Sequence, residues 1–302
     1  MKIYKNINSF KNNFKSSVLA IGNFDGVHMG HQQIFKKAKI LSKRINSKFG
    51  IFTFNPLPKD FFSRKDNKIL KNEDKINILK TYKPDFLIEQ KFDKKFSKIG
   101  YDFFVNEILI KKLKVSTIFV GKDFRFGFKR KGNVSLLKKY SNINNYNVVV
   151  VNFKKLKNHK ISSSYIRYLI SKGKIELANK IMGRSWVVSD KVILGRKIGR
   201  TIGAPTANIK IRGQIKPLFG VYAVKINIGK SSCKGVANYG VRPTFGKSSP
   251  ILEVNLFKNN RNLYNKILNV SFVKFIRNEK KFSSILELKK QIQKDIKIAK
   301  KI

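Results

Sequence analysis

The stretch "LAIGNFDGVHMGHQQIF" (residues 19–35) joins an apolar run, a glycine-rich turn and the beginning of an amphipathic pattern. The apolar run predicts a strand over Ser17–Ile21, and the pattern after the turn predicts a helix. Two of the three histidines of the chain, His28 and His31, lie in this turn. A strand, a tight turn and a helix in this order begin a βαβ unit, in which the turn meets a ligand.

The same alternation continues through the first half of the chain. Helical patterns such as "HQQIFKKAKILSKRI" and "YDFFVNEILIKKL" separate short apolar runs. These runs predict five strands, at Ser17–Ile21, Phe49–Phe54, Asp85–Ile88, Val115–Gly121 and Asn147–Phe153. Strands that alternate with helices predict a parallel sheet, and ligands bind beyond the carboxyl ends of its strands.

From about Trp186 the pattern changes to short apolar runs at close spacing, such as "GVYAVKINI" and "ILEVNLF", separated by turn residues. This spacing predicts a small antiparallel barrel or sandwich. Ser284 and Glu287 have capping-box spacing before a final amphipathic helix. Its expected apolar face consists of Ile285, Leu288, Ile292, Ile296 and Ala299. We expect this helix to pack on the barrel, with a membrane role for its basic face as the alternative, and we expect two domains, 1–183 and 184–302.

The composition excludes several classes of protein. A hydrophobic fraction of 42% is typical of a folded chain rather than a disordered one. No apolar run approaches the roughly 20 residues that span a bilayer, and the N-terminus lacks the apolar region of a secretory signal. A single cysteine, Cys233, excludes a disulfide framework and a cysteine-based zinc site. We therefore expect a cytoplasmic location.

The strong positive charge has two interpretations. The chain has 66 basic and 17 acidic residues, a formal net charge of +49. Such a charge is typical of a nucleic-acid-binding protein, but it also follows from a coding sequence biased toward Lys, Asn and Ile. The lysines are scattered rather than clustered, which favours the compositional interpretation. The charge should still strengthen the binding of anions such as nucleotides.

His28 and His31 share one face if the segment opens a helix. Backbone N–H groups at a helix N-terminus favour a phosphate, and two imidazoles would add donors. The alternatives are a zinc site and structural histidines. Zinc needs a third ligand, and the remaining histidine, His159, lies in a polar "KNHK" loop. The pattern therefore favours phosphate binding.

Five further motifs extend this interpretation to the whole chain. "GNFDGVHMGH" is followed by "VGKDFRFGFKRKG" (120–132) and "ISSSYIR" (161–167), and the second half contains "GRTIGAPTANI" (199–209), "ANYGVRPTFG" and "LEVNLF". In order and spacing they resemble the bacterial bifunctional riboflavin kinase/FAD synthetase family. The resemblance implies a Rossmann-like α/β nucleotidylyltransferase domain with a parallel sheet, followed by a small antiparallel β-barrel domain with a C-terminal helix. It also implies phosphorylation of riboflavin to FMN and adenylylation of FMN to FAD, with release of pyrophosphate.

In the first module, the resemblance implies that His28 and His31 hold the triphosphate of ATP. Arg167 is expected to act with them, while Ser162 and Ser163 grip the β- and γ-phosphates. Further nucleotide contacts are implied for Gly22, Asn23, Phe24, Asp25, Gly26 and Asp123. A flavin-binding slot is implied for Phe124, Arg125 and Phe126. Without the family, "DFRFG" is a β-turn with core aromatics.

In the second module, the resemblance implies that the Thr206 hydroxyl binds Mg²⁺ and that Asn208 lies beside the ATP phosphates. Gly195 and Gly203 are expected to let a loop fold over those phosphates. Glu253 is implied as the base that takes the proton of the riboflavin 5′-hydroxyl. Without the family, "APTAN" is a turn, and Glu253 is either a paired structural charge or a general base.

The chain departs from the family at Asn55 and Leu57, where a Glu and a His are usual, and this concerns the flavin or adenine contacts of the first module. Two rival functions are an HxGH-type enzyme acting on tRNA and a basic RNA-binding protein with relic motifs. The expected partners are riboflavin, FMN and ATP with Mg²⁺, with no specific nucleic acid and no membrane. We expect a monomer or a weak homo-oligomer.

Overall fold

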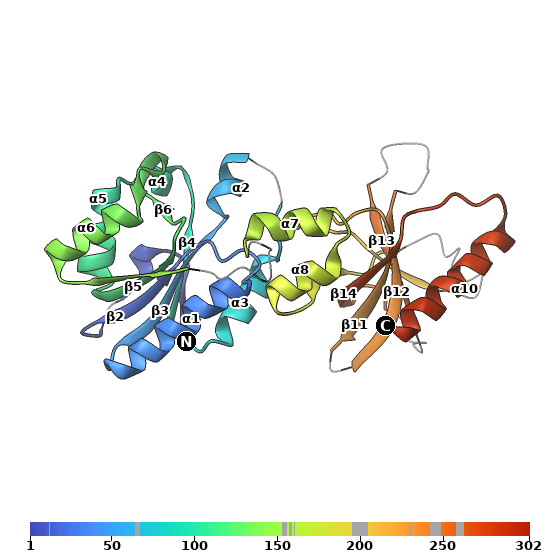
Figure 1. Ribbon diagram of the computed structural model, residues 1–302, viewed down its shortest axis with the longest axis horizontal. Helices are drawn as coiled ribbons and strands as arrows, with labels where there is room; N and C mark the ends of the chain where they lie inside the picture. The colour runs from blue at the N-terminus through green and yellow to red at the C-terminus, as the bar shows by residue number, and fades with distance from the viewer. Residues whose placement is uncertain are drawn as a thin grey trace. The chain divides into compact units, whose positions relative to one another are not determined.

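The computed structural model describes residues 1–11, 13–63, 67–152, 156, 159, 161–194, 205–229, 231–241, 249–257 and 263–302. The chain divides into two compact units, coloured mainly from blue to green and mainly from yellow to red in Figure 1. The first comprises Met1–Lys65 and Asn72–Ser162, and the second comprises Asp66–Lys71 and Ser163–Ile302. Helices α7 (Ser163–Ser171) and α8 (Ile175–Met182) are therefore grouped with the second unit. A domain boundary at residue 183 stays a prediction.

The first unit contains a six-stranded parallel sheet. Its strands, in spatial order, are β1 (Lys2–Tyr4), β4 (Phe86–Lys91), β3 (Lys48–Asn55), β2 (Ser17–Ile21), β5 (Val115–Gly121) and β8 (Asn147–Val151). Every neighbouring pair is parallel. The five predicted strands are confirmed, although Phe153 lies outside the described residues. The sequence reasoning missed β1, whose three residues are too short for a periodicity.

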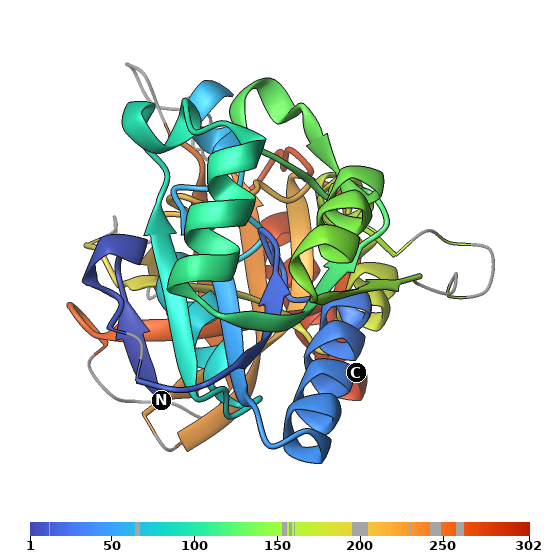
Figure 2. The ribbon, with the colours of Figure 1, turned by 90° about the vertical axis from the view of Figure 1, so that its left-hand side faces the viewer.

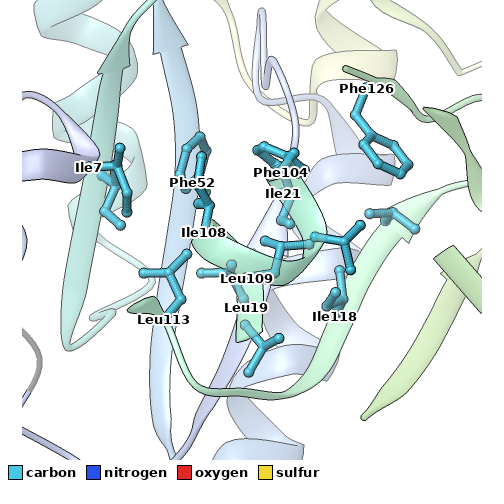
Figure 3. Close-up of a cluster of buried hydrophobic side chains, with 14 of the residues drawn as sticks. Ile7, Leu19, Ile21, Phe52, Phe104, Ile108, Leu109, Leu113, Ile118 and Phe126 are labelled. Carbon is cyan, nitrogen blue, oxygen red and sulfur yellow. The ribbon is translucent and has the colours of Figure 1, made fainter. Parts of the chain in front are cut away.

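Helices cover both faces of this sheet. All five residues of β2 are buried, as expected for a strand covered on both sides. On one face, α1 (Met29–Arg44) packs on β2 and β3. On the other, the π-helical segment Phe104–Lys112 and α6 (Val134–Asn144) bury the cluster in Figure 3, where Leu19 and Ile21 face Ile108 and Leu109. Figure 2 shows the blue α1 and the teal segment on different sides of the strands.

The remaining short elements of this unit lie in its connections. They are η1 (Ile7–Ser9), α2 (Pro58–Ser63), α3 (Asn72–Lys80), α4 (Lys94–Ser97), α5 (Tyr101–Phe103), β6 (Arg125–Phe126), η3 (Phe128–Arg130) and β7 (Gly132–Asn133).

The strand order reverses between β2 and β5. The chain runs from β2 to β3 and β4 on one side, and then crosses to place β5 on the other side of β2. In open parallel sheets, ligands bind beyond the carboxyl ends of the strands at such a reversal. The turn after β2 and the turn after β5 both lie at this edge.

The second unit contains a six-stranded antiparallel sheet. Its strands, in spatial order, are β10 (Thr206–Ile209), β13 (Ile251–Leu256), β12 (Ser231–Gly240), β11 (Gly220–Ile228), β14 (Ile267–Arg277) and β9 (Trp186–Lys191). The sheet curls into a half-barrel. A single backbone bond links its two edges: the N–H of Ile193, just after β9, donates to the carbonyl of Asn208 on β10 at 2.9 Å. The interpretation of "APTAN" as a turn is wrong for Thr206–Ile209, because these residues pair with β13 along their length.

The C-terminal helix α10 (Ile285–Lys301) begins at the expected cap, where the hydroxyl of Ser284 accepts the N–H of Glu287 at 3.2 Å. Ile296 and Ala299 pack against buried residues of β11 and β12. Ile285 is 73% exposed and does not belong to the packed face. Helix α10 therefore covers the sheet with its second half. Among the described residues, no helix combines the length and the apolar character needed to cross a membrane.

Candidate active sites

The two histidines of the HxGH motif (residues 28–31) lie together at the beginning of α1. His28 is the N-cap of the helix, and its Nδ1 accepts the backbone N–H of His31 at 3.4 Å. The imidazole rings are stacked, with centroids 3.6 Å apart and an angle of 18° between the planes. Since Nδ1 of His28 is an acceptor here, the proton of a neutral His28 ring lies on Nε2. That N–H is a donor suited to a phosphate oxygen.

The turn that precedes the histidines, residues 22–27, is tightly packed. The ring of Phe24 is fully buried and meets the ring of His31 edge-on at 5.2 Å. Phe24 can therefore reach a phosphate only through its backbone. A Cβ at Gly22 would lie 2.8 Å from the Phe24 ring, so this close packing requires glycine. Gly26 has a φ of 77°, in the left-handed region that glycine adopts without strain.

The electrostatics of this turn favour an anion. Helix α1 has 16 residues and no acidic side chain in its first turn, so the partial positive charge of its N-terminus is not offset there. The carboxylate of Asp25 is buried 3.5 Å from the ammonium of Lys59. The one acidic group of the turn is thus matched by a cation. Asn23 is exposed at the surface of the turn.

The neighbouring turn after β5 carries the "DFRFG" residues. The N–H of Phe124 donates to the carbonyl of Gly121 at 3.1 Å, and this bond closes the turn with Asp123 exposed. Phe124 stacks on Phe126 at 5.6 Å, and Phe126 belongs to the hydrophobic core. Arg125 is exposed. The half-buried Phe124, rather than Phe126, is thus the aromatic face that a planar ligand could reach.

The sequence reasoning missed a group of aromatic rings on the β3–β4 side of the same edge, which we call the aromatic cluster. Its members are in edge-on or tilted contact and are Phe54, Phe61, Phe62, Phe92 and Phe96. Phe62 is 70% exposed. The only signal in the sequence is the local density of phenylalanine, which does not say which rings meet. Leu57, which departs from the family pattern in the first module, is buried in this region.

The "ISSSYIR" residues lie at the N-terminus of α7. Ser162 directly precedes the helix, Ser163 begins it, and Arg167 follows one turn later, where its guanidinium donates to the hydroxyl of Ser164 at 3.2 Å. Ser163 and Arg167 are grouped with the second unit. Their action on the phosphates bound by His28 and His31 stays a prediction.

The register of the second sheet brings the polar residues of distant motifs together. Glu253 on β13 lies directly opposite Asn208 on β10 and Asn238 on β12. Thr206 lies opposite Asn255 in the adjacent row of the same face. The three residues expected from sequence, Thr206, Asn208 and Glu253, therefore share one face of the sheet. Gly195 and Gly203 lie outside the described residues.

Two asparagines of this face were not among the expected site residues. Asn238 flanks Glu253 on the side opposite Asn208. Asn255 is buried, and its amide donates to the carbonyl of Pro205 at 2.9 Å, which holds the backbone immediately before Thr206. Asn255 also departs from the family pattern, in which an aromatic residue or His is usual. Its contact depends on a strand pairing that the sequence alone does not specify.

A second carboxylate lies near Glu253. Gly240 is two residues beyond Asn238 on β12, and a Cβ there would collide with the carboxylate of Glu279, 1.6 Å from its Oε1. Glu279 thus occupies the space above Gly240. Burial raises the pKa of the Glu279 carboxyl; the nearby Arg277 guanidinium lowers this pKa, and the Glu253 carboxylate raises it. The net pKa is raised, with burial as the main cause and the Glu253 carboxylate as a smaller one.

The donor set of the sheet face fits a hard cation. Thr206 offers a hydroxyl oxygen, Asn208 an amide oxygen and Glu253 a carboxylate. Mg²⁺ prefers such oxygen ligands and usually completes its shell with water and substrate phosphates. Within the described ranges, no three His, Cys, Asp or Glu side chains are grouped so as to hold a metal. A cation on this face would accordingly depend on phosphate oxygens.

Comparisons with known proteins assign both halves of the chain. The family model described as FAD synthetase matches residues 10–165, and the one described as riboflavin kinase matches residues 182–302. A bifunctional riboflavin kinase/FMN adenylyltransferase of Buchnera aphidicola from Schizaphis graminum is 41% identical over 307 residues, covering 100% of this chain and 98% of the relative. Proteins with the same description from Haemophilus influenzae and Escherichia coli K12 are 36% and 34% identical, covering 99% and 92% of this chain and 98% and 90% of their own.

A crystal structure described as a macrolide-efflux protein from Streptococcus pneumoniae has the same fold. It matches with a TM-score of 0.89 and 28% identity, covering 99% of this chain and 98% of its own. Its description concerns that protein, and the match shows the fold of this chain.

Proposed function

The chain belongs to the family of bifunctional riboflavin kinase/FMN adenylyltransferases, and on this premise we propose that two separate sites perform its two reactions. The protein phosphorylates riboflavin to FMN and adenylylates FMN to FAD, with ATP as co-substrate of both steps. We assign adenylylation to the HxGH turn, which contains His28 and His31. We assign phosphorylation to the sheet face that carries Thr206, Asn208 and Glu253.

At the HxGH turn, an oxygen of the FMN phosphate attacks the α-phosphorus of ATP, and pyrophosphate leaves. No covalent enzyme intermediate is needed, so the work of the protein is to hold the reactants and neutralise the charge that develops. The stacked imidazoles at the N-cap of α1 are the observation that carries this assignment. They combine with the helix N-terminus to stabilise the triphosphate and the departing pyrophosphate. Gly22, Asn23, Phe24, Asp25 and Gly26 shape this turn.

Around this turn, we assign the flavin ring to the aromatic side chains at the same edge. Phe124 and Arg125 flank the turn after β5, and Phe126 supports Phe124 from the core. The aromatic cluster offers further apolar surface, with Phe62 exposed. Asp123 contacts the nucleotide. Ser162, Ser163 and Arg167 grip the β- and γ-phosphates, a task to which the planar fork of arginine is suited.

On the sheet face, Glu253 takes the proton of the riboflavin 5′-hydroxyl as its oxygen attacks the γ-phosphorus of ATP, and ADP leaves. The support is the strand register, which places Glu253 beside Asn208 and diagonal to Thr206. Asn208 contacts the phosphates, and the Thr206 hydroxyl would hold Mg²⁺. The bound cation would neutralise phosphate charge. We assign Gly195 and Gly203 to a loop that folds over the ATP phosphates.

The two activities divide between 1–183 and 184–302, and the enzyme acts in the cytoplasm as a monomer or a weak homo-oligomer. Its binding partners are riboflavin, FMN and ATP rather than a specific nucleic acid or a membrane.

The test follows the flavins over time after the purified protein is mixed with riboflavin, ATP and Mg²⁺. The wild type should form FMN before FAD. His31→Ala should accumulate FMN, and Glu253→Gln should form neither product from riboflavin but still convert added FMN to FAD. If His31→Ala makes FAD at the wild-type rate, or Glu253→Gln makes FMN at that rate, the corresponding site assignment is wrong.

A further inference from the structure

A buried lysine lies behind the HxGH turn and belongs to none of the motifs. Lys75, on α3, is 5% exposed. Its ammonium donates to the hydroxyl of Thr53 at 3.3 Å and to the carbonyl of Phe54 at 3.0 Å. Burying an ammonium group is costly unless it is hydrogen-bonded, and both of these acceptors lie on β3.

Thr53 extends this contact toward the turn. Its side chain is buried, and its hydroxyl donates to the carbonyl of Asn23 at 3.1 Å. The direction of the chain of bonds is unambiguous, because an ammonium group has no acceptor and a carbonyl has no donor. The order is Lys75 to Thr53 to Asn23. The Lys75 ammonium donates a hydrogen bond to an acceptor site of the Thr53 hydroxyl. The single proton of that hydroxyl therefore points to the Asn23 carbonyl.

The Asn23 carbonyl belongs to the peptide that leads into a strained segment. Phe24 has a φ of 49° and Val27 a φ of 39°, both in the left-handed region that non-glycine residues rarely adopt. Such conformations persist when the surrounding structure holds them. Two backbone bonds contribute, from Gly22 N–H to the Phe52 carbonyl at 3.1 Å and from Val27 N–H to the Phe24 carbonyl at 3.2 Å. The bond from Thr53 adds a side-chain contact that fixes the Asn23–Phe24 peptide, which lies between these two bonds in the chain.

Fixing this peptide also fixes the direction of a donor. In a planar trans peptide the C=O and the N–H point in opposite directions. With its carbonyl bonded to Thr53, the Asn23–Phe24 peptide directs the Phe24 N–H away from β3. An N–H held in this way costs no reorganisation when an anion binds.

We propose that Lys75 and Thr53 are positioning residues for adenylylation, which hold the backbone of the HxGH turn in the conformation that binds the ATP phosphates. They act through the Asn23 peptide rather than by touching substrate. This inference rests on the proposed assignment of adenylylation to that turn. A purely structural Lys75 would instead stabilise the unit without affecting ATP binding by the folded enzyme.

The test compares Lys75→Met, Thr53→Val and Thr53→Ser in the full chain. The kcat and the KM for ATP of FMN adenylylation are measured, with riboflavin phosphorylation by the same samples as the internal reference. Lys39→Met is the matched control. Lys39 lies in the same unit and also donates to a backbone carbonyl, that of Tyr82 at 3.0 Å, which lies outside the turn. Thermal melting reports the stability of each variant.

We expect Lys75→Met and Thr53→Val each to lower kcat/KM for adenylylation at least tenfold, mainly by raising the KM for ATP. Because both residues act through one peptide, the double variant should lose no more than the stronger single variant. Thr53→Ser keeps the hydroxyl and should recover most of the loss. Phosphorylation by all variants, and both reactions of Lys39→Met, should stay within twofold of wild type.

The inference is overturned if Lys75→Met and Thr53→Val lower the melting temperature but leave the KM for ATP unchanged, or if Thr53→Ser is as impaired as Thr53→Val. Should Lys75→Met fail to fold, the two Thr53 variants decide by the same criteria. His31→Ala separates the two proposals. If it retains adenylylation, the site assignment itself fails; if it loses adenylylation while the Lys75 and Thr53 variants keep it, only the positioning role fails.

Discussion

The HxGH turn of the first unit and the polar sheet face of the second are both proposed to bind ATP, but they are constructed differently. The turn takes its histidines from one continuous segment that runs from β2 into the first turn of α1. The sheet face assembles Thr206, Asn208 and Glu253 from two strands separated by more than 40 residues of sequence. A local motif can therefore specify much of the first site, whereas strand register creates the second. The two sites should respond differently to mutation, and this difference can be tested.

The largest effect is expected at Glu253. Its replacement by Gln removes the proposed base while keeping the shape of the side chain, and general-base catalysis contributes roughly 10²- to 10⁴-fold. Riboflavin phosphorylation should fall by about that factor, measured as FMN formed per minute, and conversion of added FMN to FAD should not change. Glu176→Gln, at a surface residue of α8 paired with Lys274, is the matched control. An equal loss in both reactions would contradict the separation of the two sites.

The second largest effect is expected at His28, where one substitution separates the helix-capping role of the residue from its proposed role in phosphate binding. His28→Asn keeps an N-cap residue that accepts the N–H of residue 31, but it removes the imidazole. We expect adenylylation to fall by roughly 10²- to 10³-fold, the usual loss on removing one preorganised donor, with a melting temperature near that of wild type. FAD formation from FMN and thermal melting are the measurements. Full activity of His28→Asn would mean that the ring serves the helix and not the phosphates.

The third prediction concerns stability and the C-terminal helix. Arg277 on β14 donates to both oxygens of Asp295 on α10, at 3.0 and 2.8 Å, and the Asp295 side chain is 4% exposed. Removing one partner of a buried ion pair costs about 3–5 kcal/mol, so Asp295→Ala should lower the free energy of unfolding by about 3 kcal/mol.

Urea denaturation measures this loss, and the exposed pair Lys111–Glu107 of the first unit provides the control. Glu107→Ala should cost at most about 0.5 kcal/mol, as for exposed helical pairs. If the two variants are equally stable, Asp295 does not tie α10 to the sheet. A loss of adenylylation by folded Asp295→Ala would likewise contradict the independence of the two sites.

A smaller effect is expected at Asn255, whose amide holds the Pro205 carbonyl. Asn255→Ala removes a hydrogen bond worth about 0.5–1.5 kcal/mol. The KM for ATP in riboflavin phosphorylation should rise roughly 2- to 10-fold, because the Asn255 amide no longer fixes the Pro205 carbonyl immediately before Thr206. Steady-state kinetics of phosphorylation measures this change. An unchanged KM would show that the strand pairing alone positions Thr206.

The smallest effect is expected at Glu279, and its sign depends on pH. The raised pKa of this carboxyl means that its contribution to stability is present below the ordinary pKa of 4.5 and is lost as pH rises through the folded-state pKa. Glu279→Gln should therefore be slightly more stable than wild type at pH 7, and the advantage should shrink toward pH 4.

Urea denaturation at both pH values measures this difference, and Glu287→Gln is a control of opposite sign. Hydrogen bonds from Ser283 lower the pKa of Glu287, so the Glu287→Gln variant should be less stable than wild type at neutral pH and should approach it as pH falls. A stability gain for Glu279→Gln that does not depend on pH would exclude the electrostatic cause.

The sequence by itself determined the features that depend on neighbouring residues. The alternation of apolar runs and helical patterns located the five main strands of the first sheet, and Ser284 marked the beginning of α10. The spacing of His28 and His31 places both at the N-terminus of one helix, since three residues make about one turn. These are local properties of the chain, so no distant contact was needed to predict them.

The tertiary structure decided what depends on contacts between segments far apart in the chain. Thr206–Ile209 forms a strand because β13 pairs with it, although Pro205 before it and Asn208 within it suggest a turn. The positions of Asn238 and Asn255 beside the kinase residues follow from register, and a shift by one residue would turn their side chains to the opposite face. The bonds from Lys75 through Thr53 to Asn23 likewise join segments that become neighbours only when α3 and β3 pack together. Such hydrogen bonds are specified by packing and pairing, and no periodicity in a single segment encodes them.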